Sequence, residues 1–409
     1  MDEVADVREQ EHEDMANLSE GFKMTELGPL PEDWRVVAFS EAVLNERFGV
    51  GKVRQQEYQK AGRFPIVDQG QKLIAGYWDR LEDVYQGPLP VIIFGDHSRV
   101  FKFVDFPFVC GADGTKILVP DISKFFPAFL YFALTRLEIP NRGYNRHFSL
   151  LREQRLPCPP LPEQRAIAHV LRTVQRAKEA TERVIQATQE LKKSLMYYLF
   201  TYGSVPIEEA EKVPLKETEI GLVPEHWEVV RLGEVATVKY GKARPKTQGN
   251  VPVIGSGGIY GWTATSLVDF PTLVIGRKGT AGEVWLVECP CWPSDTTFYL
   301  DWKKRVNVRF LFNYLHSNKP SGEHAKTTLP SLQRHDVEAL LIPFPPLLEQ
   351  GEICLILRAV DKKLQAEEAR KQALEALFKS LLNNLMTGKI RVKDVVLPNV
   401  GEGKGDVTH

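Results

Sequence analysis

The sequence predicts an α+β protein built as a tandem repeat of two globules of mixed helix and strand, each followed by one long helix. Three observations predict this fold. A proline-rich motif occurs twice, each time before a long segment with helical periodicity. A second motif, which contains tryptophan, precedes each globule. Between the motifs lie short β-branched runs bounded by glycine and proline, which are typical of strands.

The proline-rich motif reads Pro-Cys-Pro-Pro-Leu-Pro-Glu-Gln over residues 157–164 and Pro-Phe-Pro-Pro-Leu-Leu-Glu-Gln over residues 343–350. The segments that follow align without a gap. Prolines favour helix starts, and the motif glutamates would lie in the first turn, where the helix dipole suits a carboxylate. Gly203 and Gly388 suit helix ends. We therefore expect two helices of roughly 35 residues, each about 50 Å long.

Apolar residues recur at three- and four-residue spacing along both segments, although Glu367 and Lys371 interrupt the second stripe. A stripe of this width is typical of a coiled-coil seam or of a helix packed on one partner. Two helices of equal length most simply pack on each other, and the gapless alignment argues against two unrelated bundle helices. The main predicted seam residues are Ile167, Val174, Val184, Leu191, Leu195, Val360, Leu364, Leu374, Phe378 and Leu381.

The tryptophan motif, Thr-Glu-x-Gly-x-x-Pro-x-x-Trp, begins at Thr25 and returns at Thr218. Its Gly-x-x-Pro part predicts a turned or extended start, and the Trp-x-Val-Val that follows predicts a strand. The full repeat therefore covers nearly the whole chain. We predict an acidic, mobile tail (1–24), a first globule (25–156), a helical spacer (157–203), a linker (204–217), a second globule (218–342), a second helical spacer (343–388) and a tail (389–409).

Matching runs continue inside the two globules. Residues 91–95 correspond to residues 272–276, and both runs have the composition of buried strands. Phe129 and Phe310 each stand near the start of a predicted short helix. The spacing between matching runs drifts along the chain, so the loops differ in length while the strands persist. Each globule should be an α+β unit of about 130 residues.

Composition and charge limit the classes of function. No run approaches the roughly 18 apolar residues of a membrane span, and the N-terminus is acidic rather than signal-like, so we expect a soluble, cytoplasmic protein. The five cysteines form no CxxC pair and are interpreted as reduced thiols. Residues 1–20 hold eight acidic residues and one arginine, which leaves the rest of the chain with a net positive charge. That excess is compatible with nucleic acid but is not diagnostic.

Catalytic motifs are missing from the sequence. It contains no phosphate-binding loop, nucleophile elbow, HExxH or kinase motif. The Pro-Pro pairs lack the Asn/Asp-Pro-Pro-Tyr/Phe arrangement that holds a target adenine. Asp96 and His97 resemble an acid–base pair, but no nucleophile accompanies them. We predict no catalytic residue and no metal ligand.

Polar residues suited to nucleic acid cluster in loops that differ between the repeats. Arginine forks suit guanine, asparagine amides suit adenine, and cations suit phosphates. One charged loop is weak evidence because it is usually only solvated, but clusters at equivalent places in both repeats are stronger. The candidates in the first globule are Lys52, Arg54, Gln55, His97, Arg99, Asn141, Arg142, Tyr144, Asn145, Arg146 and His147. Those in the second are Lys239, Tyr240, Lys242, Arg244, Lys246, Arg277, Lys278 and Lys326.

Together, the two repeated motifs resemble those of the specificity (S) subunit of type I restriction–modification systems, over about residues 25–388. Residues 93–99 and 143–148 also resemble one class of target recognition domain in that family. The acidic segment before Thr25 departs from the usual start of these subunits.

The resemblance implies a division of labour. Each globule would be a target recognition domain that reads one half of a bipartite double-stranded DNA site. The two helices would pack as an antiparallel coiled coil, set the spacer and dock two methylation (M) subunits, and restriction (R) subunits would complete the complex. S-adenosylmethionine, ATP and Mg would belong to those partners, so the S subunit would need no cofactor and perform no catalysis.

Two alternatives from other classes remain open. The first is a self-contained DNA-modifying enzyme with unrecognised motifs, which would modify DNA as a purified chain. The second is a protein-binding scaffold, which would have no affinity for DNA even with methylation subunits present.

Overall fold

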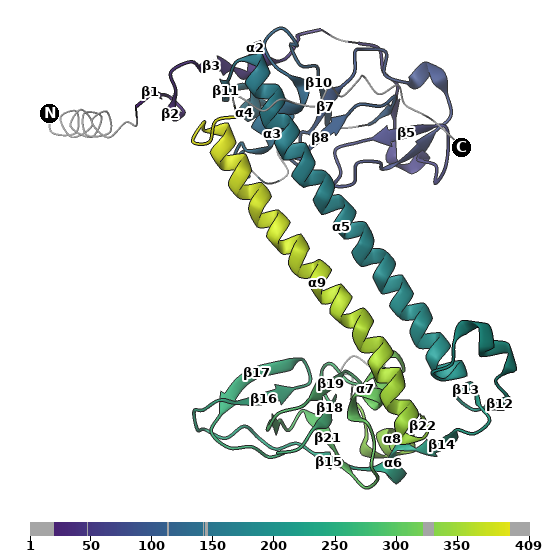
Figure 1. The fold of residues 1–409 in the computed structure, drawn as a ribbon. Helices are drawn as coiled ribbons and strands as arrows, with labels where there is room; N and C mark the ends of the chain where they lie inside the picture. The colour runs from purple at the N-terminus through teal and green to yellow at the C-terminus, as the bar shows by residue number, and fades with distance from the viewer. Residues whose placement is uncertain are drawn as a thin grey trace. The chain divides into compact units, whose positions relative to one another are not determined.

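The computed structural model describes residues 20–46, 48–112, 114–141, 143, 146–321 and 331–392. The chain forms two compact units, one from residues 1–181 with 370–409 and the other from residues 182–369. The two long helices, α5 (Leu161–Tyr202) and α9 (Leu347–Met386), can be followed in Figure 1. They contain 42 and 40 residues, so each is about 60 Å long and exceeds the predicted length. Each unit contains one part of each helix.

Both copies of the tryptophan motif begin as a β-hairpin. Strand β1 (Phe22–Thr25) pairs with β2 (Gly28–Pro31), and β12 (Leu215–Thr218) pairs with β13 (Gly221–Pro224). The threonine hydroxyl closes each turn by donating to the glycine carbonyl at 2.7 Å, and both glycines have a positive φ. Strands β1 and β12 therefore begin slightly before the predicted ends of the tail and the linker. Residues 1–19 lie outside the described part of the chain.

Besides the hairpin β1–β2, the described part of unit 1 contains three sheets and several short helices. The three-stranded sheet has the order β10 (Thr115–Leu118), β7 (Val91–Gly95), β8 (Phe101–Val104), and helix α3 (Pro127–Thr135) packs on it. The remaining elements are α2 (Phe39–Ala42), α4 (Phe148–Arg152), the 3-10 turns η1 (Gln55–Glu57) and η2 (Leu81–Asp83), the pair β3 (Arg35–Ala38) and β11 (Arg155–Cys158), and the sheet β4 (Lys52–Val53), β9 (Val109–Gly111), β5 (Phe64–Val67), β6 (Gly76–Trp78).

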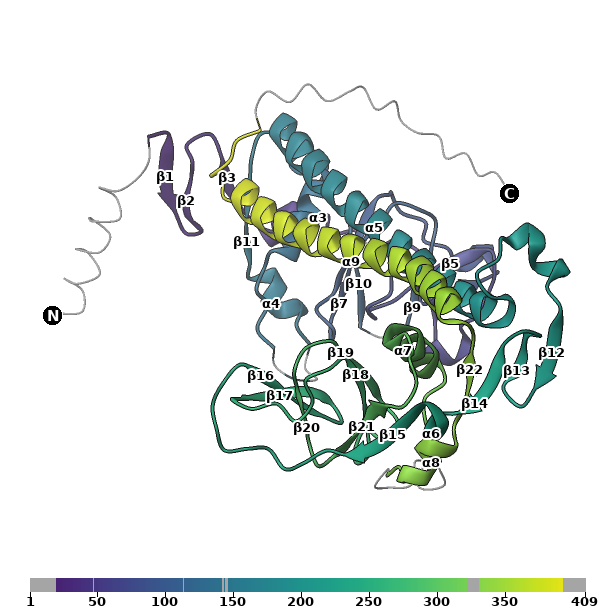
Figure 2. The same ribbon diagram turned by 60° about the horizontal axis from the view of Figure 1, so that its bottom comes forward.

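Unit 2 repeats this plan, and its sheets can be followed in Figure 2. Its four-stranded sheet has the order β15 (Ala236–Tyr240), β21 (Thr297–Trp302), β18 (Thr272–Gly276), β19 (Val284–Val287), and helix α7 (Val308–Ser317) packs on it. The remaining elements are α6 (Leu232–Val235), α8 (Arg334–Ala339), η3 (Ile207–Lys212), the pair β14 (Glu228–Arg231) and β22 (Leu341–Phe344), and the sheet β17 (Gly258–Thr263), β16 (Val251–Gly255), β20 (Trp292–Pro293). The predicted strands at 91–95 and 272–276 and both predicted short helices are confirmed.

Each unit buries parts of both long helices in its core. In unit 1, Ile167 of α5 and Leu385 of α9 belong to one cluster, and the rings of Phe132 and Phe378 lie 6.0 Å apart. In unit 2, Leu199 of α5 and Leu357 of α9 share a cluster. The globule supplies further apolar residues to each cluster, so burial concentrates at the helix ends.

The predicted seam is buried less evenly than its spacing indicated. Ile167 is fully buried, whereas Val184 and Leu191 are 40% and 56% exposed. Thr181 and Glu367, which are polar, are buried instead. The expectation of a continuous apolar seam is therefore wrong at Val184 and Leu191, and coiled-coil packing stays a prediction. The other seam residues, Val174, Leu195, Val360, Leu364, Leu374, Phe378 and Leu381, are half-buried.

Candidate nucleic-acid interface

The repeated motifs fasten each globule to the long helices. In unit 1 the indole Nε1 of Trp34 donates to Glu163 at 3.0 Å, and in unit 2 the indole of Trp227 donates to Glu349 at 3.0 Å. Arg391 also binds Glu163 at 2.7 Å. The tryptophan of one motif therefore contacts the glutamate of the other, which explains why the two motifs occur together.

The glutamine that follows each of these glutamates holds the first turn of a short helix. Gln164 accepts from the backbone N–H of Phe126 at 2.7 Å, next to α3, and Gln350 accepts from that of Asn307 at 2.8 Å, next to α7. Each amide also donates to a carbonyl of its own Pro-Pro pair. These contacts connect the start of the long helix, the proline pair and the globule. The motif glutamates and glutamines therefore serve in structural contacts and are not candidates for binding a ligand.

Three loops converge at the end of strand β7 in unit 1, and Asp96 joins two of them. Its side chain is only 2% exposed, and Oδ1 accepts from the backbone N–H groups of His147 and Phe148 at 2.9 and 2.8 Å. The carbonyl of Asp96 also lies 2.9 Å from Nδ1 of His147. A buried carboxylate with two backbone donors fixes the β7–β8 turn against the segment before α4.

The third loop follows strand β5. Its residue Gln69 accepts from the backbone N–H of His97 at 3.2 Å, and the hydroxyl of Ser98 donates to the Gln69 carbonyl. Arg99 adopts a left-handed backbone with φ of 61° and donates from its guanidinium to the Ile139 carbonyl at 2.9 Å. We name residues 68–70, 95–99, 139–141 and 146–147 the first loop cluster.

The corresponding turn in unit 2 joins β18 to β19. The guanidinium of Arg277 lies over the rings of Tyr240 and Phe298, at 5.0 and 5.9 Å, and donates to the Asp295 carbonyl. The backbone N–H groups of Arg277 and Lys278 both donate to the Thr296 carbonyl. An arginine held against aromatic rings keeps donors available at a defined position. The structure thus brings together three predicted residues, Tyr240, Arg277 and Lys278.

Aromatic side chains beside this turn were missed by the sequence reasoning. Tyr260 and Trp262 on strand β17 are both more than half exposed, and Arg244 donates to the Trp262 carbonyl at 3.1 Å. Exposed aromatic rings next to arginine can stack on bases or on other planar groups. The run Gly-Ile-Tyr-Gly-Trp carried a signal, because Gly258 and Gly261 have no side chain to cover the aromatic rings next to them.

The chain was compared with protein-family models, with individual sequences and with solved structures, and all three comparisons give matches to one family. Residues 224–376 match the family model described as the type I restriction modification DNA specificity domain. The MjaX type I restriction enzyme specificity subunit of Methanocaldococcus jannaschii is 28% identical, over 91% of this chain and 97% of that protein. The MjaVIII specificity subunit of the same organism is 28% identical, over 59% of this chain and 63% of that protein. A crystal structure of a type I restriction–modification S subunit from M. genitalium has the same fold, with a TM-score of 0.63 and 18% identity, over 90% of this chain and 98% of that chain.

The chain is similar to the specificity subunits of type I restriction enzymes over most of its length, and residues 224–376 match their DNA specificity domain.

Several predicted site residues of this chain occupy other positions than expected. His147, directly before α4, is fully buried, so the prediction of DNA contact by this side chain is wrong. Lys239 is ion-paired with Asp301 at 2.6 Å, and this hydrogen bond raises its pKa. Because side chains alternate along a strand, Lys239 and Tyr240 lie on opposite faces of β15.

The other predicted residues are exposed or lie outside the described residues. The exposed side chains are those of Lys52, Arg54, Gln55, Asn141, Arg146, Lys242, Arg244, Lys246 and Lys278, while His97, Arg99 and Arg277 are half-buried. Arg142, Tyr144, Asn145 and Lys326 lie outside the described residues.

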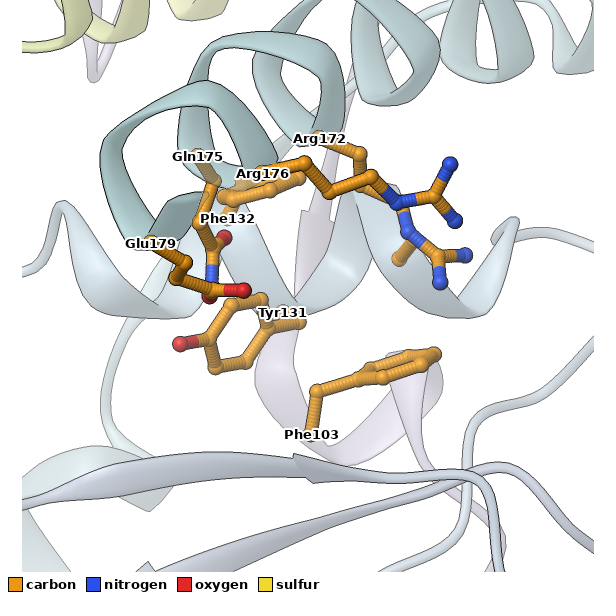
Figure 3. Close-up of a pocket in the computed structure, with 8 residues that line it drawn as sticks. Phe103, Tyr131, Phe132, Arg172, Gln175, Arg176 and Glu179 are labelled. Carbon is orange, nitrogen blue, oxygen red and sulfur yellow. The ribbon is translucent and has the colours of Figure 1, made fainter. Parts of the chain in front are cut away.

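A small pocket of about 140 Å³ lies between β8, α3 and α5 in unit 1 (Figure 3). Arg172 and Arg176 extend from α5 in the same direction above the rings of Phe103 and Tyr131. The guanidinium of Arg172 is 5.5 Å from the Phe103 ring centre. Burial, with a smaller contribution from Glu179, raises the pKa of Tyr131. The pocket therefore combines an aromatic floor with a cationic rim.

Two general properties apply to the described residues. None of their helices combines the length and the apolar character that a membrane crossing requires. Nor do they contain a group of three or more histidine, cysteine, aspartate or glutamate side chains placed to hold a metal ion.

Proposed function

We propose that this S subunit recognises a bipartite double-stranded DNA sequence in the cytoplasm, with each globule reading one half of it and with no catalysis of its own. One observation carries the proposal. Each globule has a hairpin turn after the corresponding strand of its main sheet, and the turns present different side chains, His97 and Arg99 after β7 and Arg277 and Lys278 after β18. Two domains that share their strands but differ in the polar residues of their loops are suited to recognise two different DNA sequences.

The proposal assigns the chemistry to partners. We propose two methylation subunits, which would bring S-adenosylmethionine and modify adenine, and restriction subunits that would bring ATP-dependent cleavage with Mg. The pair Arg172 and Arg176 recurs at the equivalent positions Arg358 and Lys362 of the second helix. Because each helix carries a pair of basic residues at these equivalent positions, we expect one methylation subunit per repeat. Sizing of the mixed complex should give two methylation chains per S chain, and a stable one-to-one complex at saturation would contradict this.

Replacement of Arg277 tests the DNA-reading role. Co-expression with the neighbouring methyltransferase, followed by mapping of methylated adenines, should give a two-part sequence for the natural chain. If Arg277 contacts a base, Arg277→Ala should cost about 1–3 kcal/mol of binding and relax one half of the sequence only. Lys239→Ala is the matched control, because this cation belongs to the same strand region but is paired on the other face.

The outcomes separate the proposal from its alternatives. Methylation by the purified chain alone would indicate a self-contained enzyme. An absence of DNA affinity in the complex with methylation subunits would indicate a scaffold. If Arg277→Ala weakens binding equally for every sequence and lowers the salt dependence, the residue contacts phosphate rather than a base.

A further inference from the structure

The two units differ at one edge of their main sheet. In unit 2, strand β15 follows α6 and pairs with β21 from Ala236↔Trp302 to Tyr240↔Phe298. In unit 1 the segment after α2 begins in the same way, with the bridge Val43↔Pro120 and a hydrogen bond from the Leu44 N–H to the Val119 carbonyl at 2.8 Å. Within the described residues the pairing stops there. Strand β10, which corresponds to β21, is therefore an edge strand.

A groove occupies the place of the missing strand. It has a volume of about 750 Å³ and lies between the segment after α2 and β10. Phe39, Phe48 and Phe148 are among the apolar residues that line it, together with Ile117 of β10. The groove is within the size range of binding pockets in proteins. Unit 2 shows that a five-residue strand fits the equivalent position.

The segment's own sequence explains why it does not fill the groove. Val238 of β15 points into the core of unit 2 and is fully buried, and the equivalent residue of unit 1 is Asn45, which is exposed. Burial of an asparagine amide without hydrogen-bond partners is unfavourable, so this segment does not continue as a strand. Glu46 follows directly and adds a charge.

The open edge leaves hydrogen-bonding groups without a strand partner. Because Val119 accepts from Leu44, the alternation of an antiparallel ladder directs the backbone groups of Ile117 and Thr115 toward the groove. The hydroxyl groups of Thr115 and Tyr85, both of which line the groove, have no hydrogen-bond partner within the described part of the chain. Exposed strand edges of this kind readily accept a further strand.

We propose that this groove receives an extended segment of a partner protein, which adds an antiparallel strand to β10. The apolar floor selects a segment with alternating apolar side chains. Three cations, Lys52, Lys116 and Arg152, line the groove against one carboxylate, Glu46, so acidic residues should flank the apolar ones. A DNA duplex suits the site less well, because its phosphates would face aromatic and aliphatic side chains.

Crosslinking in the assembled complex tests the proposal, and only the choice of partner rests on the proposed function. Photoreactive benzoylphenylalanine replaces Ile117, or Leu44 in a second variant, and the chain is assembled with methylation subunits and DNA. We expect crosslinks to one contiguous segment of the methylation subunit, mapped by mass spectrometry. Benzoylphenylalanine in place of Ile122, which is 74% exposed outside the groove, is the control and should give at least several-fold fewer crosslinks to that segment.

A second variant blocks the groove from within. Asn45→Val introduces an apolar residue, as β15 has at this position, so residues 44–46 should pair with β10 and reduce the crosslink from Leu44 to the methylation subunit several-fold. The methylated DNA sequence should stay the same, which separates this proposal from DNA reading by the loops. Crosslinks to DNA, crosslinks spread evenly over all components, or an unchanged crosslink in Asn45→Val would overturn the proposal.

Discussion

Single residues explain why the repeated motifs have the composition they do. Trp34 and Glu163 are far apart in the chain, yet the indole N–H and the carboxylate form one buried contact, and Trp227 and Glu349 repeat it. The sequence showed these residues as landmarks but not as partners, because periodicity within a segment carries no information on long-range pairs. His147 was misassigned for the same reason, since its burial depends on Asp96 in another loop.

Glu163→Gln should destabilise the protein by about 1–3 kcal/mol. The amide can still accept from Trp34, but the charge-assisted bonds to Arg391 are lost at a buried site. The free energy of unfolding from urea titration measures the effect. Glu26→Gln is the control, because its ion pair with Arg155 is exposed and should contribute no more than about 0.5 kcal/mol. Equal losses in the two variants would show that the Glu163 contact is no stronger than a surface pair.

At the scale of elements, the helices and strands that were predicted correctly are those with a clear local sequence pattern. The buried strands and the two long helices were found because β-branched runs and helical periodicity are local signals. The hairpins β1–β2 and β12–β13 were not expected, since each strand has only four residues and the turn depends on a threonine hydroxyl. The open edge of β10 could not be predicted from the sequence either. It arises because the segment after α2 does not continue to pair with β10, and a local sequence pattern does not show which strands pair.

The glycines that follow the long helices should not tolerate a side chain. Gly388 has a φ of 67°, and a Cβ there would collide with Pro31 and lie 3.5 Å from the Trp34 ring. Gly203 has a φ of 83° and lies against Glu349 and Trp227 in the same way. Gly388→Ala and Gly203→Ala should each lose at least about 1 kcal/mol of unfolding free energy, because both strain and crowding oppose the change.

A third glycine provides the matched control. Gly351 lies inside α9, and a Cβ added there would meet no atom within 4 Å, so Gly351→Ala should stabilise the protein by about 0.5–1 kcal/mol. Thermal and urea unfolding of the three variants measure these differences. If Gly388→Ala or Gly203→Ala stabilised the protein, the close packing around these two glycines would be contradicted.

The long helices should set the distance between the two halves of the DNA site. Four residues lengthen a helix by about 6 Å, whereas DNA rises about 3.4 Å per base pair. Paired insertions after Thr181 and Glu367 should therefore lengthen the unread spacer by about one to two base pairs while both half-sites stay unchanged. Methylome sequencing reads the spacer directly. Full activity with an unchanged spacer would show that the helices do not set this distance.

At the scale of the whole molecule, the sequence predicted the repeat, the two globules and the family. It did not predict that each compact unit would include parts of both long helices. The contact between Phe132 and Phe378 joins segments that are far apart in the chain, and a local sequence pattern does not reveal such contacts. The division into two equivalent units nevertheless supports the central claim that each unit reads its own half of a DNA sequence.

The exchange of one globule tests that claim most directly. Residues 218–342 are replaced by the corresponding segment of another specificity subunit, and the methylated adenines of the host DNA are mapped after co-expression with the methyltransferase. The first loop cluster, which belongs to unit 1, is unchanged in this variant. We therefore predict that one half of the methylated sequence changes to that of the donor while the other half stays the same. A change in both halves, or in neither half of an active complex, would contradict it.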